Sequence, residues 1–130
     1  IKVEDSDKAI NIPNLCEYHI LVLKNLKQIE AQAFFEYKNI LILKAPDLEQ
    51  IDKEGIHQCF SLTHIIAPKL QSFGYTSMGL NRSIRSIVSN VITLQEWAFI
   101  HCTGLLYVQM NQVEVINCNC FRCCYSLQSG

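Results

Sequence analysis

Four cysteines near the C-terminus form the pattern that most resembles metal chemistry. In Cys118-x-Cys120-x-x-Cys123-Cys124, the Cys-x-x-Cys spacing can present two thiolates to one tetrahedral zinc ion. A closed structural site needs four ligands, and His101 with Cys102 would be the nearby second pair. The repeat described below accounts for Cys120 and Cys124 as structural positions. We therefore predict no metal site and no cofactor, while the pattern alone leaves free, disulfide-bonded and metal-bound states open.

Cysteine and histidine stand close together twice, an arrangement that can build a nucleophilic dyad. His57 lies near Cys59, and His101 precedes Cys102. In each case the cysteine takes an inward position of the repeat, whereas the histidine falls on a turn. The chain also lacks a glycine-rich phosphate loop, a Gly-x-Ser-x-Gly elbow, a His-Glu-x-x-His helix and a paired-carboxylate motif. We therefore predict no catalytic residues and no enzyme activity.

The triplet Asn81-Arg82-Ser83 is an N-glycosylation sequon, which would matter in a secreted protein. Asn81 also occupies a position that holds cysteine in other repeats. A buried asparagine there could hydrogen-bond local backbone groups at a turn. This structural interpretation is favoured slightly over glycosylation.

The composition indicates one folded domain without the charge that a polyanionic partner requires. Hydrophobic residues make up 49% of the 130 residues and charged residues 18%, which favours a packed core over disorder. The net charge of -1 lacks the basic excess that attracts nucleic acid or an anionic membrane. The apolar runs 40–43 and 105–108 are far shorter than the about 20 residues of a membrane helix. We expect no nucleic-acid partner and no membrane insertion by this segment.

An internal repeat of about 22 residues must position all of these side chains. Its first apolar position recurs at Leu26, Leu48, Leu70, Val91 and Val113, in steps of 22, 22, 21 and 22. Each unit continues with a small residue, a large apolar residue, a cysteine position and an apolar-x-x-apolar strand that often ends before proline. A unit of this length cannot enclose its own apolar face. Stacked units, however, share a continuous core.

Equivalent positions keep size rather than identity from one repeat to the next. The small, large and cysteine positions hold, in repeat order, Ala33, Gly55, Ser77, Ala98 and Cys120, then Phe34, Ile56, Met78, Phe99 and Phe121, then Tyr37, Cys59, Asn81, Cys102 and Cys124. The inward strand positions are predicted to be Ile40 and Leu43, Leu62 and Ile65, Ile84 and Ile87, Leu105 and Val108. The alternation predicts parallel strands about 4.8 Å apart. The apolar spacing of the preceding half predicts a helical or 3₁₀ turn.

The motifs Ala33-Phe34, 59–68 and 98–102 resemble the BspA-type leucine-rich repeat, and the resemblance covers roughly residues 12–130. The fold class that we predict is an α/β repeat solenoid. It is a leucine-rich-repeat-like right-handed coil with one parallel sheet and short helical or 3₁₀ turns opposite. Three kinds of departure weaken single repeats but not the predicted fold. They are Asn81 at the cysteine position, the residue lost after Ile87, and Lys24, Asn90 and Asn111 at the proline position.

Two segments divide the chain in this interpretation. Residues 1–11 form a degenerate N-terminal segment, and residues 12–130 form the array. A first, incomplete unit places Ile12, Leu15, Tyr18 and Leu21 in the repeat positions. The segment 127–130 ends just inside a predicted strand, and no polar capping unit is visible. We therefore expect this chain to be a fragment of a longer array.

The resemblance implies a non-enzymatic binding scaffold of a kind common in bacterial surface proteins and in expanded families of parasitic protists. It implies a protein or surface ligand without identifying it. Location stays unknown, with the cell surface or secretion slightly favoured over the cytoplasm by the resemblance, because the seven cysteines do not decide the compartment.

The candidate binding residues are those that point outward from the strands, where repeat proteins usually contact partners. They are Ile20, Val22, Leu41, Ile42, His64, Ile66, Arg85, Val88, Leu106 and Tyr107. Most are apolar, and an exposed apolar patch usually marks a contact surface. Tyr107 and Arg85 are the predicted anchors, because aromatic and arginine side chains dominate interface energetics. The alternatives are that β propensity alone selects these residues, or that self-association covers them in a structural array without a separate ligand.

Overall fold

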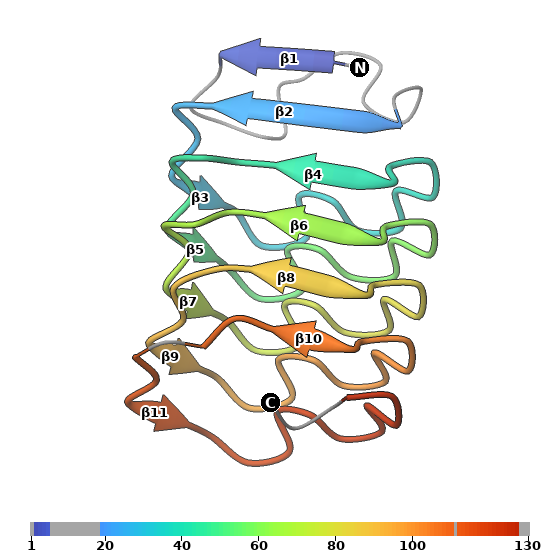
Figure 1. The fold of residues 1–130 in the computed structure, drawn as a ribbon, viewed down its shortest axis with the longest axis vertical. Coiled ribbons are helices and arrows are strands. Elements are labelled where there is room, and N and C mark those ends of the chain that lie inside the picture. The colour runs from blue at the N-terminus through green and yellow to red at the C-terminus, as the bar shows by residue number, and fades with distance from the viewer. Residues whose placement is uncertain (1, 6–18, 111, 128–130) are drawn as a thin grey trace.

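The computed structural model describes residues 2–5, 19–110 and 112–127 and shows a stack of coils with two parallel β-sheets (Figure 1). The first sheet has six strands in the order β1 (Lys2–Asp5), β2 (Ile20–Lys24), β4 (Ile42–Lys44), β6 (His64–Ile66), β8 (Ser86–Val88) and β10 (Tyr107–Val108). The second has five strands in the order β11 (Val115–Ile116), β9 (Thr93–Leu94), β7 (Ser72–Phe73), β5 (Gln50–Ile51) and β3 (Gln28–Ile29). The predicted parallel sheet is therefore present, together with a second one.

Strand register follows the repeat closely enough to locate the missing residue. In the six-stranded sheet, Ile66 pairs with Val88, a step of 22 residues. In the five-stranded sheet, Ser72 pairs with Thr93, a step of 21. The shorter coil therefore loses its residue between Val88 and Thr93, at the corner that joins the two sheets. Strands on both sides of this corner stay in register.

The prediction that the turns opposite the sheet are helical or 3₁₀ is wrong, because no described residue is helical. Two residues in each turn adopt left-handed backbone angles instead, with φ between 46° and 63°. They are Gln32 and Glu36, Glu54 and Gln58, Thr76 and Leu80, Trp97 and His101, and Asn119 and Cys123. A left-handed residue is unfavourable inside a right-handed helix, so a continuous helix cannot form here.

Hydrogen bonding in these turns alternates between neighbours along the chain and neighbours in the stack. The N–H of Ala33 donates to the carbonyl of Glu30 at 3.1 Å, within its own turn. The N–H of Phe34 donates to the carbonyl of Gly55 in the next coil at 2.8 Å. The pattern recurs in later coils. The turns thus form a third ladder that joins successive coils.

The core lies between the two sheets and the turns, and it consists of the repeat positions predicted to point inward. The strand residues Leu43, Ile65 and Ile87 are at most 2% exposed. Leu21 is also buried, whereas Ile12, Leu15 and Tyr18 lie outside the described residues. Residues 2–5, within the segment predicted to be degenerate, form β1 and pair in parallel with β2.

Candidate partner-binding face

All ten predicted binding residues lie along the six-stranded sheet. We call its outward-facing side chains, from His19 to Gln109, the sheet face. Strand register aligns Ile20, Ile42, His64, Ser86 and Tyr107 in one column across the sheet. Val22, Lys44, Ile66 and Val88 form a second column. The sequence prediction therefore brought together residues that are neighbours in space, although their role in binding stays a prediction.

A local irregularity of each strand turns two successive side chains toward solvent. The carbonyl of His19 accepts from the N–H groups of both Leu41, at 2.7 Å, and Ile42, at 3.2 Å. The carbonyl of Arg85 accepts in the same way from Leu106 and Tyr107. Ile42 stays in register with Ile20 and Tyr107 with Ser86, so no residue is inserted, and the shared carbonyl marks a bend where each strand begins. The bend adds a third outward column, to which Leu41, Arg85 and Leu106 belong.

Large apolar side chains on the sheet face are incompletely covered. The exposed fractions are 40% for Leu41, 39% for Ile66, 39% for Leu106 and 51% for Tyr107. Ile20, Val22, Ile42 and Val88 are half-buried, and His64 and Arg85 are exposed. The face therefore presents apolar area together with polar groups, as protein contact surfaces do.

Two hydrogen bonds through Thr63 orient the ring of His64 on this face. The hydroxyl of Thr63 donates to the carbonyl of Leu41 at 3.0 Å. Its oxygen is also 2.8 Å from Nδ1 of His64. Because the hydroxyl proton is already used, Nδ1 is the donor in this second bond. In the tautomer that carries its proton on Nδ1, Nε2 is the hydrogen-bond acceptor of the His64 ring.

The cysteine positions are a hydrogen-bonded ladder inside the coils. The thiol of Cys59 donates to the carbonyl of Phe34 at 2.9 Å, and that of Cys102 donates to Met78 at 3.0 Å. In each case the acceptor is the large position of the preceding coil. Burial raises the pKa of Cys59 to about 12 and also raises the pKa of Cys102. These thiols stay protonated at neutral pH, and their hydrogen bonds join successive coils.

Asn81 replaces cysteine in this ladder and takes over its donor role. Its Nδ2 donates to the carbonyl of Ile56 at 2.6 Å and to that of Met78 at 2.9 Å. Its Oδ1 accepts from the N–H of Cys59 at 2.7 Å. The side chain is fully buried. These contacts support the structural interpretation of the sequon, because the amide nitrogen that would carry a glycan is committed to the core.

Neither of the two neighbouring Cys–His pairs forms a nucleophilic dyad. The thiol of Cys59 points at backbone carbonyls, while the ring of His57 stacks on Phe35 with centroids 5.1 Å apart. Burial lowers the pKa of His57, and its Nδ1 is buried without a hydrogen-bond partner. Cys102 is buried, whereas the side chain of His101 is exposed.

The C-terminal cysteines are divided between the core and the surface. Cys118 is exposed, whereas Cys120 is buried and donates to the carbonyl of Asn117 at 2.9 Å. The thiol of Cys124 donates to the carbonyl of Phe99 at 3.0 Å, and the neighbouring Cys102 thiol lowers the pKa of Cys124. Across the described ranges, no group of three or more His, Cys, Asp or Glu side chains is arranged to hold a metal ion.

We expect alkylation to distinguish the core cysteines from the surface cysteine. In the folded protein at mildly alkaline pH, iodoacetamide should modify Cys118 at least about a hundredfold faster than Cys59. Only the thiolate reacts, and burial of Cys59 disfavours its thiolate form. Peptide mass mapping after timed quenching measures both rates. In denaturant the two rates should converge. Equal rates in the folded state would contradict the ladder.

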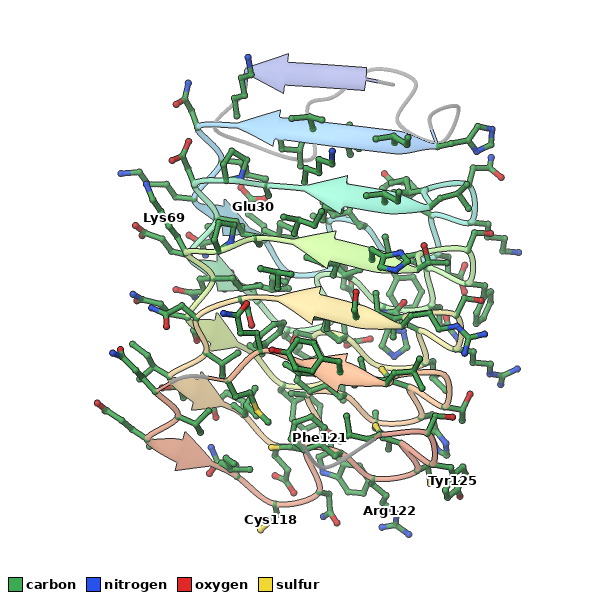
Figure 2. All side chains as sticks on the ribbon, viewed as in Figure 1. Glu30, Lys69, Cys118, Phe121, Arg122 and Tyr125 are labelled. Carbon is green, nitrogen blue, oxygen red and sulfur yellow. The ribbon has the colours of Figure 1, made fainter. Side chains whose placement is uncertain are left out.

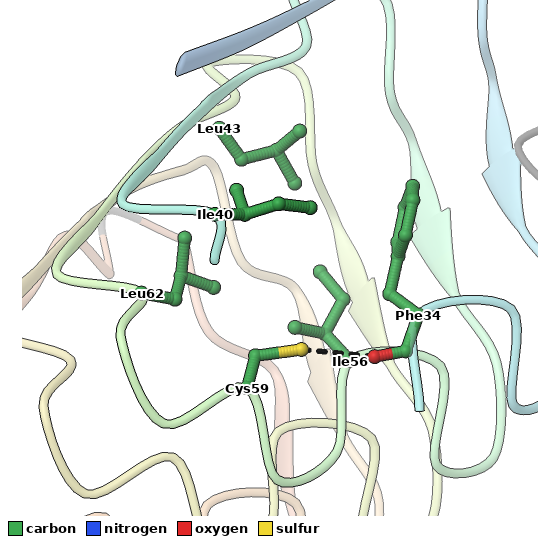
Figure 3. A pocket seen from close by; sticks show the side chains of 6 residues that line it. All are labelled: Phe34, Ile40, Leu43, Ile56, Cys59 and Leu62. Atoms are coloured by element: carbon green, nitrogen blue, oxygen red, sulfur yellow. Dashed lines mark hydrogen bonds between the residues drawn. The ribbon is translucent and has the colours of Figure 1, made fainter. Parts of the chain in front are cut away.

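One small cavity lies inside the first coils, lined by Phe34, Ile40, Leu43, Ile56, Cys59 and Leu62 (Figure 3). Its volume is about 10 Å³, and its lining is apolar. This space is at the lower limit for a single water molecule and offers no polar partner. The cavity is a packing gap and not a small-molecule site.

A second apolar surface, at the last coil, was not foreseen from the sequence. Val115 is 46% exposed and Ile116 is 56% exposed, whereas Ile29, Ile51, Phe73 and Leu94 are fully buried at the position equivalent to Ile116. We call Val115 and Ile116 the end surface. Tyr125 and Cys118 lie at the same end of the stack (Figure 2). The repeat pattern predicts that Ile116 is a core residue. In the structure it is exposed, because no described coil packs on the last one.

The stacked coils, parallel sheets and inward ladders define a parallel β-solenoid of the leucine-rich-repeat kind. The model of the BspA type leucine rich repeat region matches residues 11–128, in six copies. The chain therefore belongs to the BspA-type leucine-rich repeat family. Repeats of this family generally serve as protein-interaction scaffolds, are typically non-catalytic, and often occur in surface proteins.

A solved structure shares this fold. The crystal structure of the T. pallidum leucine-rich repeat protein is similar with a TM-score of 0.77 and 21% sequence identity. The match covers 84% of this chain and 56% of that chain, so this chain spans little more than half of its structural relative. Comparison with curated proteins finds no match. Among the described residues, none forms a helix long and apolar enough to cross a membrane.

Proposed function

We propose that this chain is a non-enzymatic scaffold that binds a protein or surface ligand through the sheet face. The observation that carries the proposal is the exposure of Leu41, Ile66, Leu106 and Tyr107 on one regularly hydrogen-bonded sheet. Strand pairing holds their backbones in place before a ligand arrives, so binding loses little backbone entropy. A cell-surface or secreted setting fits the family, and no turnover is part of the proposal.

The experiment compares two double variants of matched chemistry. Leu106→Ser with Tyr107→Ser removes an aliphatic and an aromatic group from the sheet face. Val115→Ser with Tyr125→Ser removes a similar pair from the last coil. We select ligands from a display library of random short peptides against the wild type and then measure their affinities for all three proteins.

The first variant is expected to lose at least about tenfold in affinity, since central apolar anchors typically contribute more than 1 kcal/mol each. The second should bind as the wild type does. Thermal melting of both variants controls for folding. Ligands that bind the Leu106, Tyr107 variant with unchanged affinity would contradict the proposal.

Self-association through the sheet face is a second candidate function, because a second copy of the chain would cover the exposed side chains of Leu106 and Tyr107. Light scattering over a concentration series under reducing conditions tests this candidate. Oligomers that disappear in the Leu106→Ser, Tyr107→Ser variant would support it. A wild-type monomer at every concentration would rule it out.

A further inference from the structure

The segments that form the sheet face from β4 to β10 carry only positive charge. Residues 38–44, 60–66, 82–88 and 103–109 contain no Asp or Glu. They contain four cations, which are Lys38, Lys44, Arg82 and Arg85, and all four side chains are exposed. Lys38 and Arg82 lie in the turns that enter the sheet, and Lys44 and Arg85 lie on the sheet face itself.

Acidic residues gather around the other sheet. The segments 27–30, 49–54, 71–74, 92–95 and 114–117, which contain β3, β5, β7, β9 and β11, hold five carboxylates and two lysines. One carboxylate, Asp52, accepts hydrogen bonds at 2.6 Å from the amide nitrogens of both Gln28 and Gln50. The net charge of -1 therefore conceals a separation of charge between the five-stranded sheet and the part of the six-stranded sheet from β4 to β10, whereas β1 carries Glu4 and Asp5.

Cations and exposed apolar groups alternate on the sheet face. Lys44 is in register with Ile66 on the next strand. The carbonyl of Arg85 accepts from the N–H groups of Leu106 and Tyr107, so Arg85 stands beside the two most C-terminal apolar groups of the face. Neighbouring parallel strands lie about 4.8 Å apart. A ligand that reaches Lys44 or Arg85 therefore also contacts an apolar side chain.

We propose that the partner of the sheet face is an acidic polypeptide segment that carries apolar side chains. Its carboxylates would pair with Lys44 and Arg85, and its apolar side chains would cover Leu106, Tyr107 and Ile66. This inference rests on the proposed function and adds the chemistry of the partner. A polypeptide fits better than nucleic acid or an anionic membrane, because those partners require denser positive charge and make no use of isolated Leu and Ile side chains.

The test uses the peptide pool selected against the wild type and a charge reversal with a matched control. Lys44→Glu with Arg85→Glu reverses the sheet face. Lys27→Glu with Lys53→Glu changes the net charge equally near the five-stranded sheet. Selected peptides should be enriched in Asp and Glu together with Leu, Phe and other apolar residues. Their affinity should fall at least about tenfold in the first variant, remain unchanged in the second, and weaken as salt is added.

Outcomes distinguish this inference from the function on which it rests. Peptides that depend on Leu106 and Tyr107 but are neutral or basic would overturn the acidic partner and leave the binding face intact. Peptides that ignore both residues would overturn both proposals. Wild-type oligomers that the Lys44, Arg85 reversal dissolves would identify a second copy as the occupant. Tighter binding to transfer RNA or to phosphatidylserine vesicles than to any selected peptide would overturn the polypeptide assignment.

Discussion

Replacing Asn81 with alanine should lower the free energy of unfolding by about 3–5 kcal/mol. The substitution removes the side-chain partner of the N–H of Cys59 and of the carbonyl of Ile56, and one of two partners of the carbonyl of Met78, which keeps its bond from the thiol of Cys102. A buried polar group left without a partner is destabilising by roughly 1–3 kcal/mol, and the lost amide also leaves a cavity. Urea denaturation of the wild type and the variant measures the difference.

The matched control is Asn81→Cys, which restores the residue type of the ladder. A thiol at this position can donate to the carbonyl of Ile56 as the thiol of Cys102 donates to that of Met78. The N–H of Cys59 is then free to donate to the residue three positions earlier, as the N–H of Cys102 does to Phe99. We expect this variant to unfold within about 1 kcal/mol of the wild type. Equal, small effects of both substitutions would show that the ladder contributes little.

The repeat period made the core and the sheet face predictable from sequence. Each inward position recurs at least four times, so a single unusual residue such as Asn81 does not obscure the pattern. Once inward residues are assigned, the remaining strand residues must face outward. This reasoning placed Leu106 and Tyr107 on the surface, where the structure shows them 39% and 51% exposed. Their ligand could not be predicted, because periodicity describes the scaffold and not its partner.

The turns and the second sheet could not be predicted, for separate physical reasons. The left-handed residues of the turns include Trp97, Leu80 and Gln58, which carry none of the glycine or asparagine signature of such conformations. Their backbone is imposed by hydrogen bonds between coils. The strands of the second sheet have two residues each, too few to show alternation. A pair such as Gln28 and Ile29 becomes a strand because the next coil supplies Gln50 and Ile51 beside it.

Charge separation was visible in the sequence only after the strands were placed. Total composition gives a net charge of -1, which argues against a polyanionic partner for the chain as a whole. Grouping the same residues by sheet assigns Lys44 and Arg85 to one side and Glu49 and Asp52 to the other. Local charge, more than net charge, decides which ligand a surface attracts. The acidic partner proposed above depends on this grouping.

Replacing the stacked phenylalanines Phe99 and Phe121 with alanine should lower the free energy of unfolding by different amounts. Phe99 is fully buried, with its ring centroid 4.8 Å from that of Phe73 and 5.1 Å from that of Phe121. Phe121 occupies the same position in the last described coil but is only half-buried. Removing a buried phenyl ring typically costs about 3–5 kcal/mol, and the loss shrinks when the ring is partly hydrated beforehand.

We therefore expect Phe99→Ala to lower the free energy of unfolding by about 3–5 kcal/mol and Phe121→Ala by about half as much. Phe60→Ala serves as the control, because its ring, half-buried like that of Phe121, is not among those packed against the core and lies 5.7 Å from the Arg82 guanidinium, a contact with an expected effect below about 1 kcal/mol. Urea unfolding followed by the fluorescence of Trp97, the single tryptophan, reports on the coil that contains Phe99. Each coil is stabilised mainly by its neighbours. Truncating Phe99 therefore weakens contacts with the coils on both sides, whereas truncating Phe121 weakens contacts with the single described neighbouring coil. Equal losses for Phe99 and Phe121 would contradict this nearest-neighbour account and show that the last coil is packed as firmly as the interior.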